Sequence, residues 1–296
     1  MRRPDLSIVM PIHNDPASRA LAGLSSDLSA LCVNSLPTVD LIVVDDASSD
    51  GTVALVRETL QGLKNAKLVE LKTHRGPGVA RNAGLDLADG EFVTFVDADD
   101  VADPEVLLEG VSLARRTRAD VVALGYQEKG EFGLPTVMMP ESGVSLGSLL
   151  TRRAAVWRFI FRSEFLAISD IRFPELFYAE DVLFALRIAE AKPKFESLPK
   201  CAYTYFLHSS GLSGSDPAPK RAEIAVQELL QLEASSPSPE VASLARAWAA
   251  RIAFRTRRRL IRTDPRALAR VAARMVANPK DALLLTKSAH QARGYK

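Results

Sequence analysis

The chain has 296 residues, 47% hydrophobic and 25% charged, a balance typical of a globular protein with one large core or a core plus a smaller part. Its formal net charge of +2 is too small to indicate nucleic acid as a partner. Cys32 and Cys201 form no CxxC pair, so neither a disulfide framework nor a zinc site is supported. The N-terminal residues do not resemble a signal peptide, and no apolar run approaches the roughly 20 residues that span a bilayer. We therefore expect a protein of the reducing cytoplasm.

Strand and helix patterns alternate through about residue 125. Apolar runs predict strands at Leu6–Ile12, Leu41–Val44, Ala66–Leu71 and Phe92–Val96. Helical spacing and turn signals predict helices at Pro16–Val33, Thr52–Leu60 and Val79–Ala88. This alternation predicts an α/β fold with a doubly wound, mainly parallel sheet and right-handed crossovers.

The pattern is less regular beyond Gly125. Glycines and prolines punctuate residues 130–143, which fits either short strands or a mobile flap. Helical spacing returns near Glu180–Ala191, and Ser209–Pro219 has the composition of a loop or lid.

Only helices are expected after that loop, with breaks near Ser235–Pro239, at Pro265 and at Pro279. We therefore divide the chain into a domain of residues 1–215 and a basic helical region of residues 216–296.

The strand at Phe92–Val96 ends in three acids, Asp97, Asp99 and Asp100. Open α/β sheets bind ligands beyond the carboxyl ends of their strands, and two alternating carboxylates can converge on one hard cation. The alternative is an acidic turn that caps the helix starting near Pro104. We expect Asp97 and Asp99 to hold Mg²⁺ or Mn²⁺, and Asp100 to cap or to support the site.

Polar residues also follow the first two strands: Pro11, His13 and Asn14 after the first, and Asp45 and Asp46 after the second. The carboxyl ends of parallel strands lie on one edge of the sheet. A diphosphate-linked ligand there needs an acceptor for its base, which Asp45 or Asp46 could supply. Capping of the next helix is the alternative for this acidic pair.

Five segments together carry a resemblance to a known family: Ser7–Asn14, Leu41–Thr52, Ala80–Leu85, Gly90–Asp100 and Glu180–Asp181. In order and spacing the chain resembles a family 2 glycosyltransferase of the GT-A fold from residue 6 to about residue 185. The helical tail is not covered.

The resemblance implies roles for the nucleotide end of the site. In such enzymes the position of Pro11 lines the nucleoside pocket, that of Asp46 bonds the base, and that of Arg81 lies near the diphosphate. Two departures concern base stacking and turn shape: His13 stands where Tyr is frequent, and Ala47 where Gly is frequent.

The resemblance also implies the catalytic groups. Asp97 and Asp99 match the metal-binding DxD pair, with Asp99 as the direct ligand and Asp97 also facing the nucleotide. Asp181 matches the general base of inverting members, and Glu180 beside it is the second candidate. The alternative for this pair is a helix N-terminus that favours acids. His208 after a tyrosine-rich strand could join the metal or a phosphate, or be an ordinary surface residue.

Two further residues have structural alternatives. Arg81 could pair with Asp86 or Asp97 instead of a phosphate. Trp157 could form an acceptor platform, although an aromatic side chain in the core is the better default.

Residues 246–274 contain ten arginines and a single acid, Asp264. Helical projection concentrates much of this charge on one side. Such a stretch is either a solvated face or a surface attracted to anionic lipid headgroups. Contacts in a homo-oligomer or with an anionic polymer acceptor are further options, and the absence of a recognised module argues against nucleic acid.

The resemblance implies a metal-dependent, inverting glycosyltransferase that transfers a sugar from a nucleotide-sugar donor, UDP-linked by first expectation, to a glycan, polymer or lipid-linked acceptor. Such an enzyme works in the cytoplasm or at the inner face of the cell membrane. A nucleotidyltransferase would share the sheet and the metal site, but the sequence lacks a basic Gly-rich loop after the first strand. A catalytically silent nucleotide-binding or scaffold protein is the alternative from another class.

Overall fold

The computed structural model describes residues 3–15, 18–32, 39–130, 134–141, 143–207, 218–263, 266 and 269–273. The chain forms two compact units. The first comprises Met1–Val144, Val156–Glu175 and Pro193–His208, and the second Ser145–Ala155, Leu176–Lys192 and Ser209–Lys296. The predicted boundary between residues 215 and 216 lies outside the described residues and stays a prediction.

In the described residues, the first unit is built around one nine-stranded sheet. The strands are β1 (Leu6–Ile12), β2 (Val39–Asp45), β3 (Ala66–Glu70), β4 (Phe92–Phe95), β5 (Val101–Ala102), β6 (Val121–Lys129), β7 (Thr136–Met138), β8 (Phe159–Arg162) and β9 (Phe195–Phe206). Their order is β3-β2-β1-β4-β8-β6-β9-β5, with β7 beside β6. The first four are parallel, as are β6 and β9, whereas β8 runs antiparallel to β4 and β6. The predicted mainly parallel sheet is confirmed.

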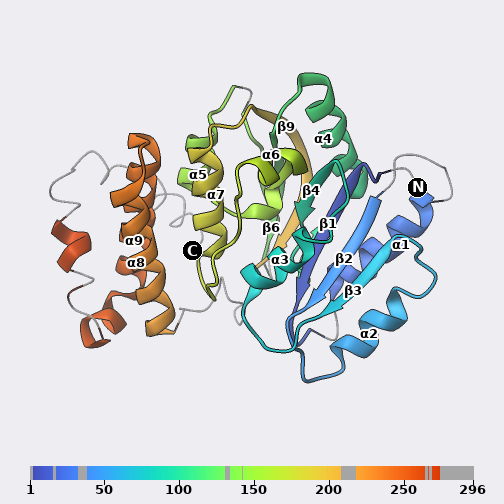
Figure 1. Ribbon diagram of the computed structural model, residues 1–296, viewed down its shortest axis with the longest axis horizontal. Helices are drawn as coiled ribbons and strands as arrows, with labels where there is room; N and C mark the ends of the chain where they lie inside the picture. The colour runs from blue at the N-terminus through green and yellow to red at the C-terminus, as the bar shows by residue number, and fades with distance from the viewer. Residues whose placement is uncertain are drawn as a thin grey trace. The chain divides into compact units, whose positions relative to one another are not determined.

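The helices of the first unit are α1 (Arg19–Cys32), α2 (Thr52–Thr59), α3 (Pro77–Leu85), α4 (Pro104–Thr117), the 3₁₀ turn η1 (Val156–Arg158) and α6 (Ser163–Ile168). Figure 1 shows β4, β1, β2 and β3 side by side. The chain steps from β1 outward to β3 and then returns, through α3, to β4 on the other side of β1. This reversal between β1 and β4 is the kind of switch point where open α/β sheets bind ligands.

Burial explains why the first strands have continuous apolar sequences. All residues of β2 and β4 are buried, whereas the edge strand β3 is only partly covered. Helix α3 packs against β1 and β2, and a Cβ on Gly84 would lie 2.3 Å from Cγ1 of Val9, so glycine permits this close approach. The helix begins two residues before the predicted Val79 because Pro77 occupies its first turn, directly after Gly76 at φ 91°.

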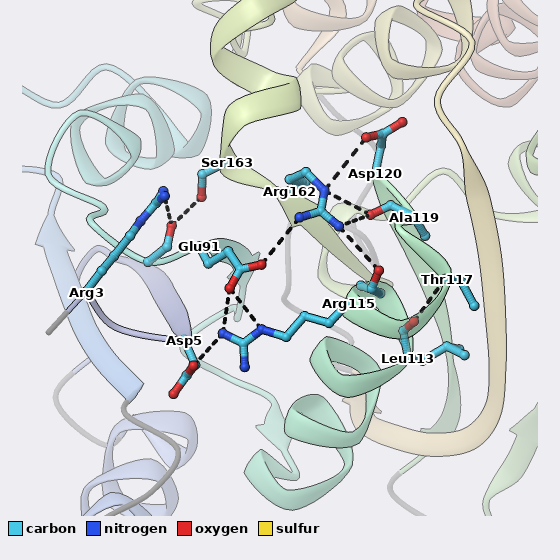
Figure 2. Close-up of polar contacts among 12 residues, drawn as sticks. Arg3, Asp5, Glu91, Leu113, Arg115, Thr117, Ala119, Asp120, Arg162 and Ser163 are labelled. Carbon is cyan, nitrogen blue, oxygen red and sulfur yellow. Dashed lines mark hydrogen bonds and ion pairs between the residues drawn. The ribbon is translucent and has the colours of Figure 1, made fainter.

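A polar network ties together the amino ends of several strands (Figure 2). The Arg115 guanidinium donates to Oε2 of Glu91 from Nε at 2.9 Å and from Nη2 at 2.6 Å, and it also contacts the buried Asp5. Arg162 lies 3.4 Å from the other oxygen of Glu91 and donates to the carbonyl of Ala119 at 2.9 Å. Because β1, β4, β8 and α4 all contribute to this network or directly flank it, it fixes their relative positions.

The second unit is helical in its described part: α5 (Leu146–Arg152), α7 (Glu180–Glu190), α8 (Pro219–Ser235) and α9 (Pro239–Thr263). The break predicted near Ser235–Pro239 is confirmed, while Pro265 and Pro279 lie outside the described residues. No helix in the described ranges is long and apolar enough to cross a membrane.

Part of the arginine-rich stretch makes contacts inside this unit. Arg251 Nη2 donates to the carbonyl of Thr151 at 2.9 Å, which satisfies a carbonyl at the C-terminal end of α5. Arg246 forms a 2.7 Å ion pair with Glu233 of α8, and both side chains are nearly buried. These two arginines hold helices together, so the basic stretch is not uniformly a solvated face.

Candidate functional site at the carboxyl edge of the sheet

The carboxyl ends of β1, β2 and β4 carry the polar residues that the sequence singled out. Nδ1 of His13, after β1, lies 2.8 Å from the backbone oxygen of Asp46, which follows β2. The backbone N–H of Asn14 donates to Oγ of Ser48 at 2.9 Å. Since β1 lies between β2 and β4, Asp97 extends from the neighbouring strand at the same edge. The structure thus brings the predicted acids of this unit to one edge of the sheet.

The Asp46 carboxylate organises the Gly-rich loop that precedes α3. Oδ1 accepts the backbone N–H of Arg75 at 2.9 Å, and Oδ2 accepts that of Gly76 at 2.7 Å. Nδ1 of His74 lies 2.9 Å from Oδ2, and Asp46 is only 2% exposed. The alternative that Asp46 caps the next helix is wrong, because Gly51 occupies the N-cap position of α2. The predicted contact with a nucleotide base stays a prediction.

Asp45 shapes the turn after β2. Oδ2 accepts the backbone N–H of Ser48 at 3.0 Å, and Oδ1 is buried without a hydrogen-bond partner among the described residues. Ala47 between them has φ 58°, a conformation in which glycine is favoured. This positive φ is the physical reason why glycine suits that position.

Two histidines stack beside this turn, which the sequence did not reveal. The rings of His13 and His74 lie 3.8 Å apart, centroid to centroid, at an interplanar angle of 14°. Both imidazoles reach Asp46, one to its backbone oxygen and one to its carboxylate. The pair therefore links the end of β1 to the Gly-rich loop.

Arg81 of α3 neutralises the first acid of the DxD pair. Its Nη2 lies 2.7 Å from Oδ1 of Asp97, and the arginine side chain is 5% exposed against 28% for the aspartate. The guanidinium also lies over the Phe173 ring at 5.4 Å. The ion-pair alternative for Arg81 is confirmed, with Asp97 as the partner, whereas Asp86 pairs with Arg172.

The three acids after β4 occupy different environments. Asp99 is exposed, Asp97 is half-buried and Asp100 is fully buried. Burial, followed by the charges of Asp97 and Asp99, raises the pKa of Asp100 to about 8. None of the three caps α4, because Asp103 does so by accepting the backbone N–H groups of Glu105 and Val106.

Asp100 is held by β9, another contact that the sequence did not reveal. Oδ2 accepts the Tyr203 hydroxyl at 2.7 Å, and Oδ1 accepts the backbone N–H of Phe206 at 2.8 Å. Trp157 is 4% exposed and stacks on the Tyr203 ring with centroids 4.3 Å apart, so its core alternative is confirmed. The available signal in the sequence was the tyrosine-rich strand, because a buried tyrosine hydroxyl needs a hydrogen-bond partner.

Glu180 and Asp181 lie in the second unit, in the first turn of α7. Glu180 is 7% exposed and Asp181 is half-buried. An Asp181 carboxylate oxygen lies 2.8 Å from the backbone nitrogen of Val182. The predicted ligand His208 lies outside the described residues.

No cluster of three or more His, Cys, Asp or Glu side chains able to hold a metal occurs in the described part of the chain. Asp97 and Asp99 still offer hard oxygen donors from one short turn. Mg²⁺ is commonly bound by one or two carboxylates together with substrate phosphates. This donor set therefore fits a cation shared with a diphosphate, not a fully protein-coordinated ion.

Comparisons with known proteins agree with this geometry. Residues 7–169, more than half of the chain, match the family described as Glycosyl transferase family 2. The poly(ribitol-phosphate) beta-N-acetylglucosaminyltransferase TarS of Staphylococcus aureus is 31% identical over 212 residues, covering 69% of this chain and 36% of TarS. The succinoglycan biosynthesis protein ExoO of Rhizobium meliloti is 30% identical over 227 residues, covering 71% and 63%. The chain thus spans about a third of one relative and under two thirds of the other.

Solved structures extend the likeness beyond the matched segment. The crystal structure of S. aureus TarS 1–349 in complex with UDP-GlcNAc superposes with a TM-score of 0.65 at 26% identity, covering 85% of this chain and 72% of that one. A mannosyltransferase from Pyrobaculum calidifontis, in complex with GDP-Man and Mn²⁺, shares the fold at a TM-score of 0.58 and 20% identity. The mixed α/β architecture, the edge of acids and the matched segment together show that the chain belongs to glycosyl transferase family 2.

Proposed function

We propose that the protein transfers a sugar from a nucleoside diphosphate donor to a hydroxyl group of a glycan, polymer or lipid-linked acceptor. The observation that carries this proposal is the turn bearing Asp97 and Asp99 at the switch point between β1 and β4, beside the buried Arg81. Because TarS was solved with UDP-GlcNAc, we propose a UDP-linked sugar as donor and UDP-GlcNAc as the first to test.

The diphosphate end of the donor is assigned to the DxD turn. Asp97 and Asp99 would hold Mn²⁺ or Mg²⁺, which would supply Lewis-acid neutralisation of the leaving diphosphate. Arg81 keeps the Asp97 carboxylate in place through its 2.7 Å ion pair. The Mn²⁺ in the related mannosyltransferase complex supports a divalent ion.

The nucleoside end is assigned to the edge between β1 and β2. Pro11 is half-buried there, Asp45 ends the neighbouring strand β2 and Asp46 follows it. Asp46 already accepts two backbone N–H groups, so its main contribution would be to place the Gly-rich loop around the donor. His208 stays a candidate for the metal or a phosphate.

Asp181 is proposed as the general base of a single, inverting displacement. Its carboxylate would accept the proton of the acceptor hydroxyl as the oxygen attacks the anomeric carbon. The bond to the diphosphate oxygen breaks, and the nucleoside diphosphate leaves with the electron pair. The N-terminus of α7 favours the ionised carboxylate that a base requires. Glu180 is more buried and is the second choice.

The decisive experiment measures UDP release from UDP-GlcNAc with Mn²⁺, alongside UDP binding. Asp181→Asn should lower turnover by about 100- to 10,000-fold while UDP binding persists. Glu164→Gln changes an exposed acid in the first turn of α6 and should leave both unchanged. Nucleotide binding without turnover across donors and acceptors would instead support a silent binding protein, and full activity in Asp181→Asn would remove it as the base.

The predicted contact of the basic C-terminal stretch with anionic lipid also stays a proposal, as do homo-oligomer formation and a cytoplasmic location. Arg246 and Arg251 make contacts within their own unit, so the proposal does not depend on these two side chains. Co-sedimentation with vesicles containing anionic phospholipid, against neutral vesicles, tests it.

A further inference from the structure

One buried hydroxyl group connects the DxD turn to a strand a hundred residues away. The Tyr203 hydroxyl accepts the backbone N–H of Asp97 at 3.0 Å and donates to Oδ2 of Asp100 at 2.7 Å. The backbone N–H of Asp100 in turn donates to the carbonyl of Asp97 at 3.2 Å. These three bonds close a ring around the turn that contains Asp99.

The tyrosine itself has little freedom to move. Its side chain is 2% exposed, and its ring stacks on Trp157 at an interplanar angle of 5°. Its backbone pairs with Ala102 of β5, just beyond the turn, and the backbone N–H of Asp103 donates to the carbonyl of Ala202 at 2.9 Å. The position of the hydroxyl is therefore fixed by the sheet.

The opposite side of the turn is held by the start of α1. Oγ of Ser18 donates to the carbonyl of Ala98 at 2.8 Å, and the backbone N–H of Ala20 donates to the same oxygen at 3.2 Å. Residues 97–100 are thus held from two sides, and the Tyr203 hydroxyl bonds both the first and the last residue of the turn.

We propose that Tyr203 is a positioning residue for the cation site, because its hydroxyl sets the turn so that the Asp97 and Asp99 carboxylates converge on one ion. This inference rests on the proposed function, in which a divalent ion joins that turn to the donor diphosphate. Groups that orient metal ligands through hydrogen bonds contribute about 10- to 100-fold to metal affinity or activity. Tyr203 touches neither ion nor donor in this assignment and acts through the turn.

The test is calorimetric titration of UDP into the full chain at several Mn²⁺ concentrations. Tyr203→Phe keeps the ring and its stack on Trp157 but removes the hydroxyl. We expect the Mn²⁺ concentration for half-maximal enhancement of UDP binding to rise about tenfold or more, with UDP affinity in the absence of metal unchanged. The electron paramagnetic resonance spectrum of bound Mn²⁺ should change in the same variant.

Tyr205→Phe is the matched control, because it also removes a tyrosine hydroxyl from a ring that stacks on Trp157, with centroids 5.6 Å apart. The two carboxylate oxygens of Asp100 accept from the Tyr203 hydroxyl and from the backbone N–H of Phe206. It should bind Mn²⁺ like the wild type. If the wild type shows no Mn²⁺-dependent UDP binding, the proposed function fails. If it does, and Tyr203→Phe matches Tyr205→Phe, or loses metal-free UDP binding equally, the positioning role is overturned. Should Tyr203→Phe fail to fold, Asp100→Asn, which alters the acceptor of the same hydroxyl, takes its place with the same criteria.

Discussion

The acids at the two edges of the first unit's sheet have different surroundings. At the amino edge, Asp5 and Glu91 share the Arg115 guanidinium, and Glu91 also meets Arg162 (Figure 2). At the carboxyl edge, three acids lie within four residues: Arg81 pairs with Asp97, and Arg19 donates to the backbone oxygen of Asp99 at 3.4 Å. Acids paired with arginines stabilise a fold, whereas acids crowded together raise one another's pKa.

The crowding has a measurable consequence at the carboxyl edge. The pKa of Asp100 is raised to about 8 by burial and by its two acidic neighbours, and burial also raises that of its partner Tyr203 well above its usual value. Under the proposed function, a divalent cation bound at this turn would lower the repulsion between these carboxylates. Ion pairs with Arg115 and Arg162 hold acids at the amino edge, whereas the carboxyl edge is the proposed cation site.

The largest effect that separates the two edges is expected from Asp99→Asn. Removing one exposed carboxylate from the DxD turn should lower sugar transfer by about 100-fold or more, because the leaving diphosphate loses charge neutralisation. The thermal midpoint should hardly change, since the side chain is exposed. Product release assays and thermal unfolding measure the two quantities.

Asp89→Asn is the control from the other edge, an exposed acid 3.5 Å from Lys67. It should leave both turnover and the thermal midpoint near the wild-type values. Equal losses of turnover in the two variants would show that the edges do not differ in function.

Arg115→Met should have the opposite effect, lowering stability and leaving turnover intact. Asp5 is 3% exposed and would lose its guanidinium partner, while the arginine is itself 39% exposed, which lessens the loss. We expect the free energy of unfolding to fall by about 2 kcal/mol. The thermal midpoint should fall by roughly 4–8 °C. Turnover per folded molecule should persist.

Arg116→Met, at the exposed neighbour on the same helix, separates loss of the network from loss of a surface charge. Chemical denaturation followed by circular dichroism measures both variants. If Arg115→Met unfolds like Arg116→Met, the network of Figure 2 does not stabilise the sheet.

The carboxyl edge was predictable because its pattern is local. A run of apolar residues followed by acids marks both a buried strand and its end, so β1, β2 and β4 and the residues after them were found from the sequence. The alternation of strands and helices then placed Asp46 and Asp97 at one edge.

Contacts between distant segments were not predictable in the same way. Tyr203 meets Asp100 only because β9 pairs with the two-residue strand β5, and no local pattern states that pairing. Likewise, the sequence around Asp46 fits either a helix cap or a ligand contact. The hydrogen bonds from the backbone of the Gly-rich loop to its carboxylate are found only in the structure. The antiparallel insertion of β8 next to β4 has the same origin, since its partners lie far away in sequence.

The smallest effect concerns Asp40, a buried acid of β2 near the amino edge that pairs in register with Ser7. Burial is the largest cause that raises the pKa of its carboxyl above the usual value. The folded protein therefore binds this proton more tightly than the unfolded chain does. The stability that Asp40 contributes is full below the unfolded pKa and is lost as pH rises through the folded pKa.

Asp40→Asn removes this titration, so the variant should gain stability relative to the wild type between about pH 4 and about pH 7. Any constant cost of the buried amide cancels in that comparison, because it is the same at both pH values. Urea unfolding at a series of pH values measures the difference, and the exposed Glu58→Gln on α2 should follow the wild-type trend. A constant offset between Asp40→Asn and wild type at every pH would show that Asp40 titrates in the folded protein as it does in the unfolded chain. Burial would then shift the pKa of a carboxyl at the carboxyl edge and not at Asp40.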